Sequence, residues 1–169
     1  MLSKVFFIYF ATVIVLMSSL AITRRNAMHG VLYMLLMFFH LAGLYLFLNA
    51  EFLAAVQIII YAGAIMVLFL FVVMLLNLRE DVQKSRFIRP WVIGFIISSG
   101  VMVIALKAAK SAAVERTGHW GIKEIQSTTH ISAIGQELYT RYLYPFELAS
   151  LVLLVAIVGA IVLAKKRLK

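Results

Sequence analysis

Long apolar runs dominate the chain and alternate with short polar segments. Five of them stand out, at residues 5–23, 27–48, 52–78, 91–106 and 146–164. Most exceed the ~18 residues that mark a candidate membrane span, and the fourth can be extended at both ends to a full crossing. Because the runs are continuous rather than alternating, they indicate helices and not the strands of a barrel. The pattern predicts an all-α polytopic membrane protein with five transmembrane helices, at about 5–23, 27–48, 52–78, 88–107 and 146–164.

The composition excludes a water-soluble fold. Apolar residues make up 64% of the chain and charged residues 14%, against roughly 45–50% and about 25% in globular proteins. A soluble domain of 169 residues needs more polar cover than this. The absence of cysteine excludes disulfides, thiolate metal sites and iron–sulfur ligation. We expect residues 1–169 to form a single membrane domain with an outer loop at 108–145, in which residues 131–144 are amphipathic enough to lie along the membrane surface.

The formal net charge of +9 encodes orientation in the membrane. With five crossings, one side carries most of the cations, opposed only by Glu80 and Asp81: Arg24, Arg25, Arg79, Lys84, Arg86, Arg89, Lys165, Lys166, Arg167 and Lys169. The other side is nearly neutral, so the positive-inside rule predicts an outside N-terminus and a cytoplasmic C-terminus. The basic segments then contact anionic lipid headgroups, and we expect no nucleic-acid partner. The first run ends without a small-residue cleavage site, so we interpret it as a retained helix.

The third run, residues 52–78, carries the most information. Its 27 residues would span about 40 Å as an α-helix, against a hydrocarbon core near 30 Å. The excess can be absorbed by tilt, by protrusion or by a turn without normal helical rise. Several β-branched residues and Gly63 lower the helix preference at one place. There Gln57 and Tyr61, four residues apart, share one face near mid-membrane and need polar partners, while small residues predict a helix packed on several sides.

Each of these features has a structural explanation beside the functional one. Small residues in a membrane helix usually form packing surface. Tyr61 alone fits packing or an interhelical hydrogen bond, and Gly63 alone fits close packing. Their coincidence with Gln57 in an overlong span favours a functional site.

Three ionisable side chains in or beside the predicted spans are further candidates. His40 lies near the middle of the second run, where it is either a functional group or, as we favour, a neutral imidazole bonded to a neighbouring helix. Glu51 and Glu147 open the third and fifth helices; they either complement the helix dipole, which we favour, or accept protons from outside. We find no catalytic motif, and the isolated histidines of the outer loop indicate no metal site.

The third run also resembles a known family. Its core is similar to the signature helix of subunit J of proton-pumping NADH:quinone oxidoreductase, respiratory complex I: Ile60-Tyr61-Ala62-Gly63-Ala64-Ile65-Met66-Val67-Leu68-Phe69. Supporting similarities are Asn26-Ala27-Met28-His29-Gly30, Leu41-Ala42-Gly43-Leu44 and Pro145-Phe146-Glu147-Leu148-Ala149-Ser150. The resemblance covers nearly the whole chain and is strongest over residues 26–78 and weakest over 107–135.

The resemblance implies a subunit without a redox centre of its own, in a complex that uses NADH, FMN, iron–sulfur clusters and quinone in other subunits. It implies contacts with small neighbouring subunits, the quinone-site subunit and the antiporter-like subunits, in the cell inner (plasma) membrane. It also implies a π-bulge near Tyr61 and Gly63 that switches between α and π forms and so opens or closes a water path for protons. Gln57 stands where some relatives carry Glu, so it can only orient water or form hydrogen bonds, and no family role transfers to His40.

Together, residues and resemblance predict a non-redox membrane-arm subunit that couples quinone reduction to proton translocation. The gating residues are Tyr61, Gly63 and Gln57, with Val67 and Phe69 as apolar side chains that seal the closed path. Two alternatives stay open. In the first, the chain is a structural scaffold of the same complex or of a related cation antiporter complex. In the second, it is a stand-alone small transporter.

Overall fold

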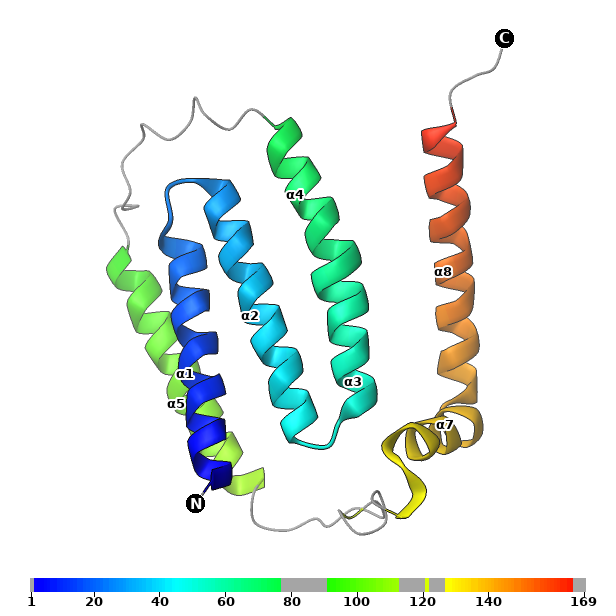
Figure 1. The fold of residues 1–169 in the computed structure, drawn as a ribbon, viewed down its shortest axis with the longest axis horizontal. Helices are drawn as coiled ribbons and strands as arrows, with labels where there is room; N and C mark the ends of the chain where they lie inside the picture. The colour runs from blue at the N-terminus through cyan, green and yellow to red at the C-terminus, as the bar shows by residue number, and fades with distance from the viewer. Residues whose placement is uncertain (1, 77–90, 113–120, 122–126, 166–169) are drawn as a thin grey trace. The chain divides into compact units, whose positions relative to one another are not determined.

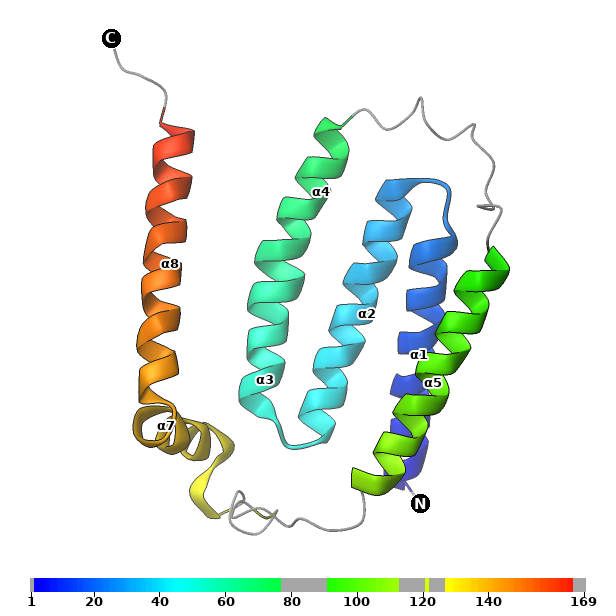
Figure 2. The same cartoon turned by 180° about the vertical axis from the view of Figure 1, so that it is seen from behind.

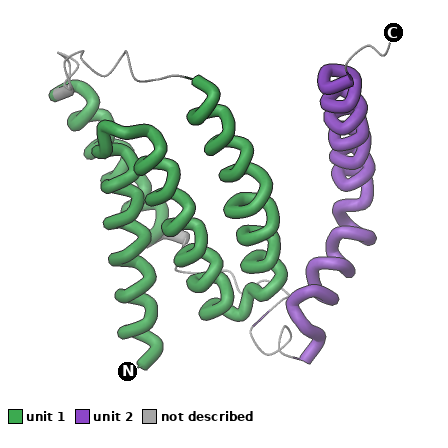
Figure 3. The backbone as a smooth tube through the Cα atoms, turned by 45° about the horizontal axis from the view of Figure 1, so that its top comes forward, with its two compact units in different colours: residues 1–119 green, residues 120–169 purple. Residues whose placement is uncertain are grey.

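The computed structural model describes residues 2–76, 91–112, 121 and 127–165, and every regular element within them is helical. Five helical spans among these residues are long and apolar enough to cross a membrane, which confirms the predicted all-α polytopic fold. The chain divides into two compact units, Met1–His119 and Trp120–Lys169 (Figure 3). The end of the predicted third span, the charged loop that follows and the start of the predicted fourth span, together residues 77–90, lie outside the described residues.

The described part of the first unit contains six helical segments. They are α1 (Leu2–Thr23), α2 (Ala27–Phe47), α3 (Glu51–Val56), the π-helix η1 (Gln57–Ile65), α4 (Met66–Leu75) and α5 (Trp91–Ala112). The segments α3, η1 and α4 follow one another without a break and form one membrane-length helix, the third helix (Figure 1).

The helix α2 is central to this arrangement. It packs against α1 on one side and against the third helix on the other (Figures 1 and 2). In the described residues, α1 and the third helix share no contact. The short connections at 24–26 and 48–50 impose this antiparallel order. The first three helices therefore form a compact antiparallel group, with α2 between its two neighbours.

Two asparagines form the turns at either end of α2. The Asn26 side-chain oxygen accepts a hydrogen bond from the Met28 backbone N–H at 2.9 Å and so caps the N-terminus of α2. Asn49 has a φ of 58°, a left-handed conformation that asparagine tolerates better than most residues. The Ala50 N–H then reaches the Tyr45 carbonyl oxygen at 2.9 Å, which closes the C-terminus of α2 in a Schellman arrangement. Both turns are thus specified by local sequence.

Glycines set the approach of α1 to α2. A Cβ at Gly30 would lie 2.9 Å from the Ala21 carbonyl oxygen, and one at Gly43 would lie 2.6 Å from the Phe10 ring. Real Cβ contacts are longer than this, so an added Cβ would have to move the backbone of α1 at Gly30 and the Phe10 ring at Gly43. Close backbone approach through small residues is the usual means of packing helices in lipid, where burial of apolar surface does not drive them together.

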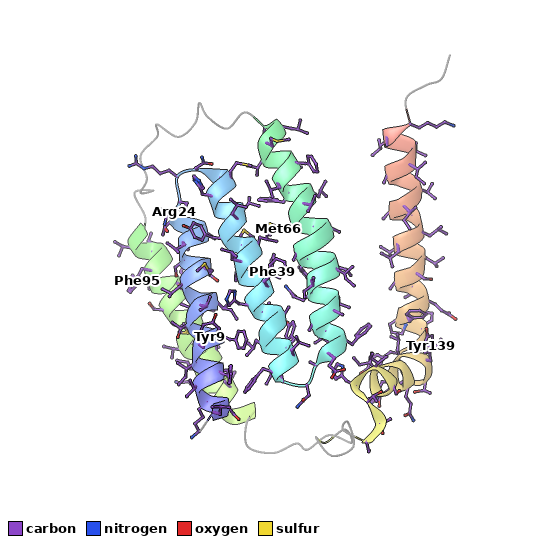
Figure 4. The ribbon with its side chains drawn as sticks, viewed as in Figure 1. Tyr9, Arg24, Phe39, Met66, Phe95 and Tyr139 are labelled. Atoms are coloured by element: carbon purple, nitrogen blue, oxygen red, sulfur yellow. The ribbon has the colours of Figure 1, made fainter. Side chains whose placement is uncertain are left out.

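The described part of the second unit consists of an amphipathic and an apolar helix. They are α7 (His130–Thr140) and α8 (Leu143–Ala164). The amphipathic stretch predicted at 131–144 is therefore divided between two helices. The Tyr139 ring of α7 packs edge-on against Phe146 of α8, with 5.4 Å between the ring centroids, and stabilises the corner between them (Figure 4).

Two helix ends differ from the prediction. The helix α8 begins at Leu143 rather than near 146, because a proline, here Pro145, is tolerated in the first turn of a helix. The helix α5 continues through Ala112 instead of ending at 107. The added residues 108–112 are mostly alanine and lysine, which have high helix propensity.

Candidate functional site

The third helix changes its hydrogen-bonding pattern at mid-length. Residues Gln57–Ile65 form a π-helix of nine residues, η1, between two α-helical segments. Hydrogen bonds in a π-helix run from an N–H to the carbonyl five residues earlier, as from Met66 to Tyr61 at its end. The π-bulge predicted in the third span is therefore confirmed, and it extends beyond a single turn. Such segments are rare in proteins, and those that occur often lie at functional sites.

The sequence of η1 explains where the α-helix gives way. It contains three consecutive β-branched residues, Ile58–Ile60, followed by Gly63, and all of these lower α-helical preference. The backbone flanking η1 has ordinary right-handed angles, with φ −60° at Val56 and −69° at Met66. The π-helix is therefore joined to α3 and α4 through residues with ordinary α-helical angles.

The buried face of the third helix shows the effect of the π-helix on packing. It consists of Ala54, Gln57, Ala62 and Met66, which are 2, 5, 6 and 2% exposed. The steps along this face are three, five and four residues, whereas one face of an α-helix repeats every three or four. Among the described helices, α2 is the one neighbour of these segments, so this face packs against α2 (Met66 is labelled in Figure 4).

In a regular α-helix Tyr61 would be buried and Ala62 exposed, but here the two are exchanged. Ala62 is buried, while Tyr61, four residues after Gln57, is 45% exposed. The Tyr61 ring still reaches Phe38 of α2, with 5.7 Å between the ring centroids. Gln57 and Tyr61, which were predicted to share a face, therefore both lie toward α2. Gln57 lies within the contact and Tyr61 at its edge.

Gln57 is the one buried polar side chain in the part of the chain that the structure describes. Its Nε2 atom is buried and donates no hydrogen bond to any described residue. A buried donor without an acceptor costs about 1–3 kcal/mol, and lipid tails offer no acceptor. The residue at which the π-helix begins thus also has a buried polar group without a partner among the described residues.

Gly63 lies on the exposed side of η1. A Cβ at this position would lie 3.3 Å from the Ile58 carbonyl oxygen, which is tighter than nine in ten real Cβ contacts. The obstacle is the backbone of the same helix, so the contact depends on the π register. Ala55 and Ala64 are also exposed. Within this chain, only the small residues that face α2 are packed, and the other small residues of the third helix are left uncovered.

The remaining predicted site residues lie outside η1. Val67 and Phe69 belong to α4 and are 48% and 47% exposed. Glu51 is the exposed first residue of α3, where a carboxylate complements the helix dipole. Glu147, predicted to open the last helix, is instead the fifth residue of α8, whose first turn contains no acidic residue. Glu51 therefore has the position that the helix-dipole explanation requires, and Glu147 lies just beyond the first turn of its helix.

His40 connects α2 to α1, on the side of α2 that faces α1. Its Nδ1 donates to the Leu36 carbonyl oxygen at 2.8 Å, since a carbonyl can only accept. Its Nε2 and the Tyr9 hydroxyl of α1 form a second, long hydrogen bond of 3.4 Å (Tyr9 is labelled in Figure 4). His40 therefore bonds both to its own helix and to a neighbouring one.

Two aromatic partners, Tyr9 and Phe38, were not predicted from the sequence. A signal for them exists, because residues at equal distances from a tight turn face each other across an antiparallel helix pair. Tyr9 and His40 are nearly equidistant from the turn at 24–26, and Phe38 and Tyr61 from the turn at 49.

The chemistry available to these residues is narrow. The described residues contain no group of three or more His, Cys, Asp or Glu side chains that could hold a metal ion. The functional groups of η1 are an amide, a phenol and the backbone. Such a site can form hydrogen bonds and change its register.

Sequence comparisons assign the family. Residues 17–163 match the family described as NADH-ubiquinone/plastoquinone oxidoreductase chain 6. The chain is 39% identical to NADH-ubiquinone oxidoreductase chain 6 of Cyanidium caldarium, with 96% of this chain and 84% of the relative covered. It is 37% identical to NADH-quinone oxidoreductase subunit J of Rhodobacter capsulatus (93% and 79% covered) and 34% identical to that of Rickettsia bellii (96% and 80% covered). The resemblance seen in the third span is thus confirmed, and the chain belongs to the NADH-ubiquinone/plastoquinone oxidoreductase chain 6 family, whose bacterial relatives are named subunit J.

Proposed function

We propose that this chain is a non-redox membrane-arm subunit of NADH:quinone oxidoreductase that couples quinone reduction to proton translocation through a change of register in η1. The observation that carries the proposal is a nine-residue π-helix within a membrane-length helix. Membership of the family and the names of the relatives support the kind of complex. The mechanism is argued from the third helix alone.

A return of η1 to an α-helix would remove the extra residue from the contact with α2. The step after Gln57 would shorten from five residues to four, and Tyr61 would take the buried position now held by Ala62. Farther along, Ile65 would replace Met66 in the same way. Each residue of an α-helix turns by about 100°, so α4 would rotate by that angle relative to α3. The exchange changes which side chains of α4 meet lipid or neighbouring subunits.

The two registers can be close in free energy. The β-branched residues and Gly63 weaken the α form. The Gln57 amide has no partner within the described chain, and it weakens the π form by about 1–3 kcal/mol as long as no other group bonds to it. A few kcal/mol of differential contact then shifts the population from one form to the other. In the proposal, electron transfer to quinone elsewhere in the complex changes the packing around the third helix and supplies that difference.

The exposed side of the third helix borders the proton path in this proposal. One register lets water connect carboxylates of neighbouring subunits past Tyr61 and Gly63. The other places an apolar side chain, Val67 or Phe69, across the path; both are about half exposed on this chain. Glu51, exposed at the start of α3, is the carboxylate of this helix that can accept protons near the outer surface. Exposed Glu147 is the corresponding candidate on α8.

In the proposal the chain holds no cofactor of its own. NADH, FMN, iron–sulfur clusters and quinone are held by other subunits, which fits a sequence without cysteine. The partners are small neighbouring subunits, the quinone-site subunit and the antiporter-like subunits, and they cover exposed apolar faces that lipid does not. The basic segments place the C-terminus in the cytoplasm and the N-terminus outside the inner membrane.

A structural scaffold in the same complex is the second candidate. The observation that favours it is the α1–α2 pair, in which Gly30 packs against backbone and Gly43 against the Phe10 ring. On this account Tyr61 and Gly63 serve only for packing. Damage to them would then reduce assembly and electron transfer together.

Gly63→Val in the assembled complex separates the two candidates. Its Cβ would lie 3.3 Å from the Ile58 carbonyl oxygen and disfavour the π register. We expect proton pumping per NADH oxidised to fall about twofold or more, with assembly and NADH oxidation retained. Gly100→Val on α5 is the matched control, because a Cβ at Gly100 meets nothing within 4 Å. Full pumping by the Gly63→Val complex contradicts the gate, and parallel loss of assembly and NADH oxidation supports the scaffold.

A further inference from the structure

The buried amide of Gln57 points to a bound ligand that is not part of the register change proposed for η1. We propose that Gln57 holds a water molecule between α2 and η1, with Nε2 donating to the water oxygen. The inference deepens the proposed function and rests on it for its role in gating. The site itself rests on one observation, a polar atom that is buried at the first residue of η1 and has no described partner.

The helix pair around Gln57 offers the amide no side-chain acceptor. The side chain is 5% exposed, and its neighbours along the same face are Ala54 and Ala62. On α2, the buried residue at nearly the same distance from Asn49 is Ala42, which lies seven residues before Asn49, as Gln57 lies eight residues after it; Ala42 is 1% exposed. Alanine side chains carry no polar atom. The acceptor must therefore be a group that does not belong to these side chains.

The burial of Gln57 favours a water molecule over a side chain of a neighbouring subunit as that acceptor. A side chain of a neighbouring subunit would have to reach an amide that this chain already covers with α2. A water molecule is smaller than any polar side chain and is tethered to no backbone. Buried waters typically make about three hydrogen bonds to otherwise unsatisfied polar groups. Nε2 supplies one of these bonds, and backbone carbonyls, each with two lone pairs, can accept the others.

Water at Gln57 would respond to the register of η1. In the π register the small side chain of Ala62 holds the next buried position, and Tyr61 lies at the edge of the contact. In the α register Tyr61 would move into that position, and its ring would displace the water. Occupancy of the site thus stabilises the π form, and loss of the water accompanies the α form. The ligand is therefore also part of the regulation of the gate.

High-resolution maps of the assembled complex test the site. We expect a water peak at about 3 Å from Nε2 of Gln57 whenever η1 is in its π register. Gln57→Leu, which keeps the size of the side chain and removes its polar atoms, should abolish the peak. The same replacement on α7, Gln136→Leu, should leave it in place. A dry amide in the wild-type π register, or a side chain of a neighbouring subunit bonded to Nε2, overturns the proposal even if Gln57→Leu fails to assemble.

Thermal stability provides a second readout. If the Gln57 amide is unsatisfied in the wild type, Gln57→Leu should be more stable, because the substitution removes the free-energy cost of a buried, unpaired donor and breaks no hydrogen bond. A water-bound amide should give no rise in the melting temperature. A clear rise in Tm of the Gln57→Leu complex therefore contradicts the water site.

The water site and the gate can fail separately. A pumping defect in Gly63→Val without a water peak at Gln57 overturns the water site and leaves the gate standing. A peak that Gln57→Leu abolishes, together with full pumping by Gly63→Val, keeps the site and overturns the gate.

Discussion

The helix α2 makes two different contacts with its two neighbours. Toward α1, glycines bring the backbones together, with Gly30 against the Ala21 carbonyl and Gly43 against Phe10. Toward the third helix, alanines and one glutamine pack around a π-helix that carries an extra residue. In the proposed mechanism, α2 thus holds one neighbour in a fixed position and lets the other change its register.

The polar side chains follow the same division. Toward α1 they have partners: the Ser18 hydroxyl donates to the Ile14 carbonyl at 2.7 Å, and that of Tyr9 to His40 at 3.4 Å. Toward the third helix, Nε2 of Gln57 has no partner among the described residues. Since lipid cannot replace a lost hydrogen bond, the satisfied side resists rearrangement more than the unsatisfied one. Substitutions on the two sides should therefore reduce different quantities, assembly on one and coupling on the other.

The largest effect is expected from a side chain at Gly30. In Gly30→Ala the Cβ lies 2.9 Å from a backbone oxygen of α1, which cannot yield unless the two helices separate. We expect a cost of about 3 kcal/mol and loss of most of the assembled complex on native gels. Gly43→Ala should cost less, because its obstacle is the edge of the Phe10 ring, which can turn.

The control for this comparison is Gly94→Ala on α5, where a Cβ meets nothing within 4 Å. If Gly30→Ala assembles as well as the control does, the α1–α2 contact is not the fixed side of the molecule.

Tyr61 gives the intermediate effect and tests the adjustable side. Its ring contact with Phe38 is worth about 0.5–1.5 kcal/mol, too little to decide assembly. We expect Tyr61→Ala to assemble and oxidise NADH, while the number of protons pumped per NADH falls about twofold or more. Tyr61→Phe keeps the ring and should pump more than Tyr61→Ala. If both variants lose assembly and NADH oxidation together, the contact is structural and the comparison fails.

The smallest effect is expected from the bond between Tyr9 and His40. Hydrogen bonds between membrane helices contribute about 0.6 kcal/mol on average, and this one is long at 3.4 Å. Tyr9→Phe should therefore destabilise the chain by no more than that and leave proton pumping unchanged. A double-mutant cycle with His40→Ala, measured by unfolding in detergent, gives the coupling energy. A coupling above about 1.5 kcal/mol, or a pumping defect in Tyr9→Phe, would show that His40 does more than join two helices.

Most of the fold could be predicted because lipid permits few structures. Continuous apolar runs must be helices in a bilayer, and the short polar segments at 24–26 and 49–50 leave adjacent helices antiparallel. The weak place in the third helix could also be located, since the β-branched run and Gly63 lie in a span that is too long, whereas the π form itself was implied by the family resemblance. The two helix ends that differ, at Ala112 and Leu143, lie outside the apolar runs, where hydropathy carries no information.

The details of the site could not be predicted because they depend on which residue meets α2. An extra residue in one turn moves the buried position from 61 to 62, and no local property of Tyr61 or Ala62 shows this. The unsatisfied amide of Gln57 likewise depends on the absence of a polar side chain across the contact. The bond between Tyr9 and His40 depends on the register of a helix pair, which becomes visible once the turn at 24–26 is known to be tight.

Maps of the complex at rest and during turnover test the central claim most directly, namely that the backbone around residue 61 has two registers of similar free energy. The account predicts two hydrogen-bond patterns. In one, described here, the Met66 N–H bonds to the Tyr61 carbonyl and Ala62 is buried. In the other, the same N–H bonds to the Ala62 carbonyl and Tyr61 is buried. A single five-residue pattern at this position in every state of a pumping complex would contradict the account.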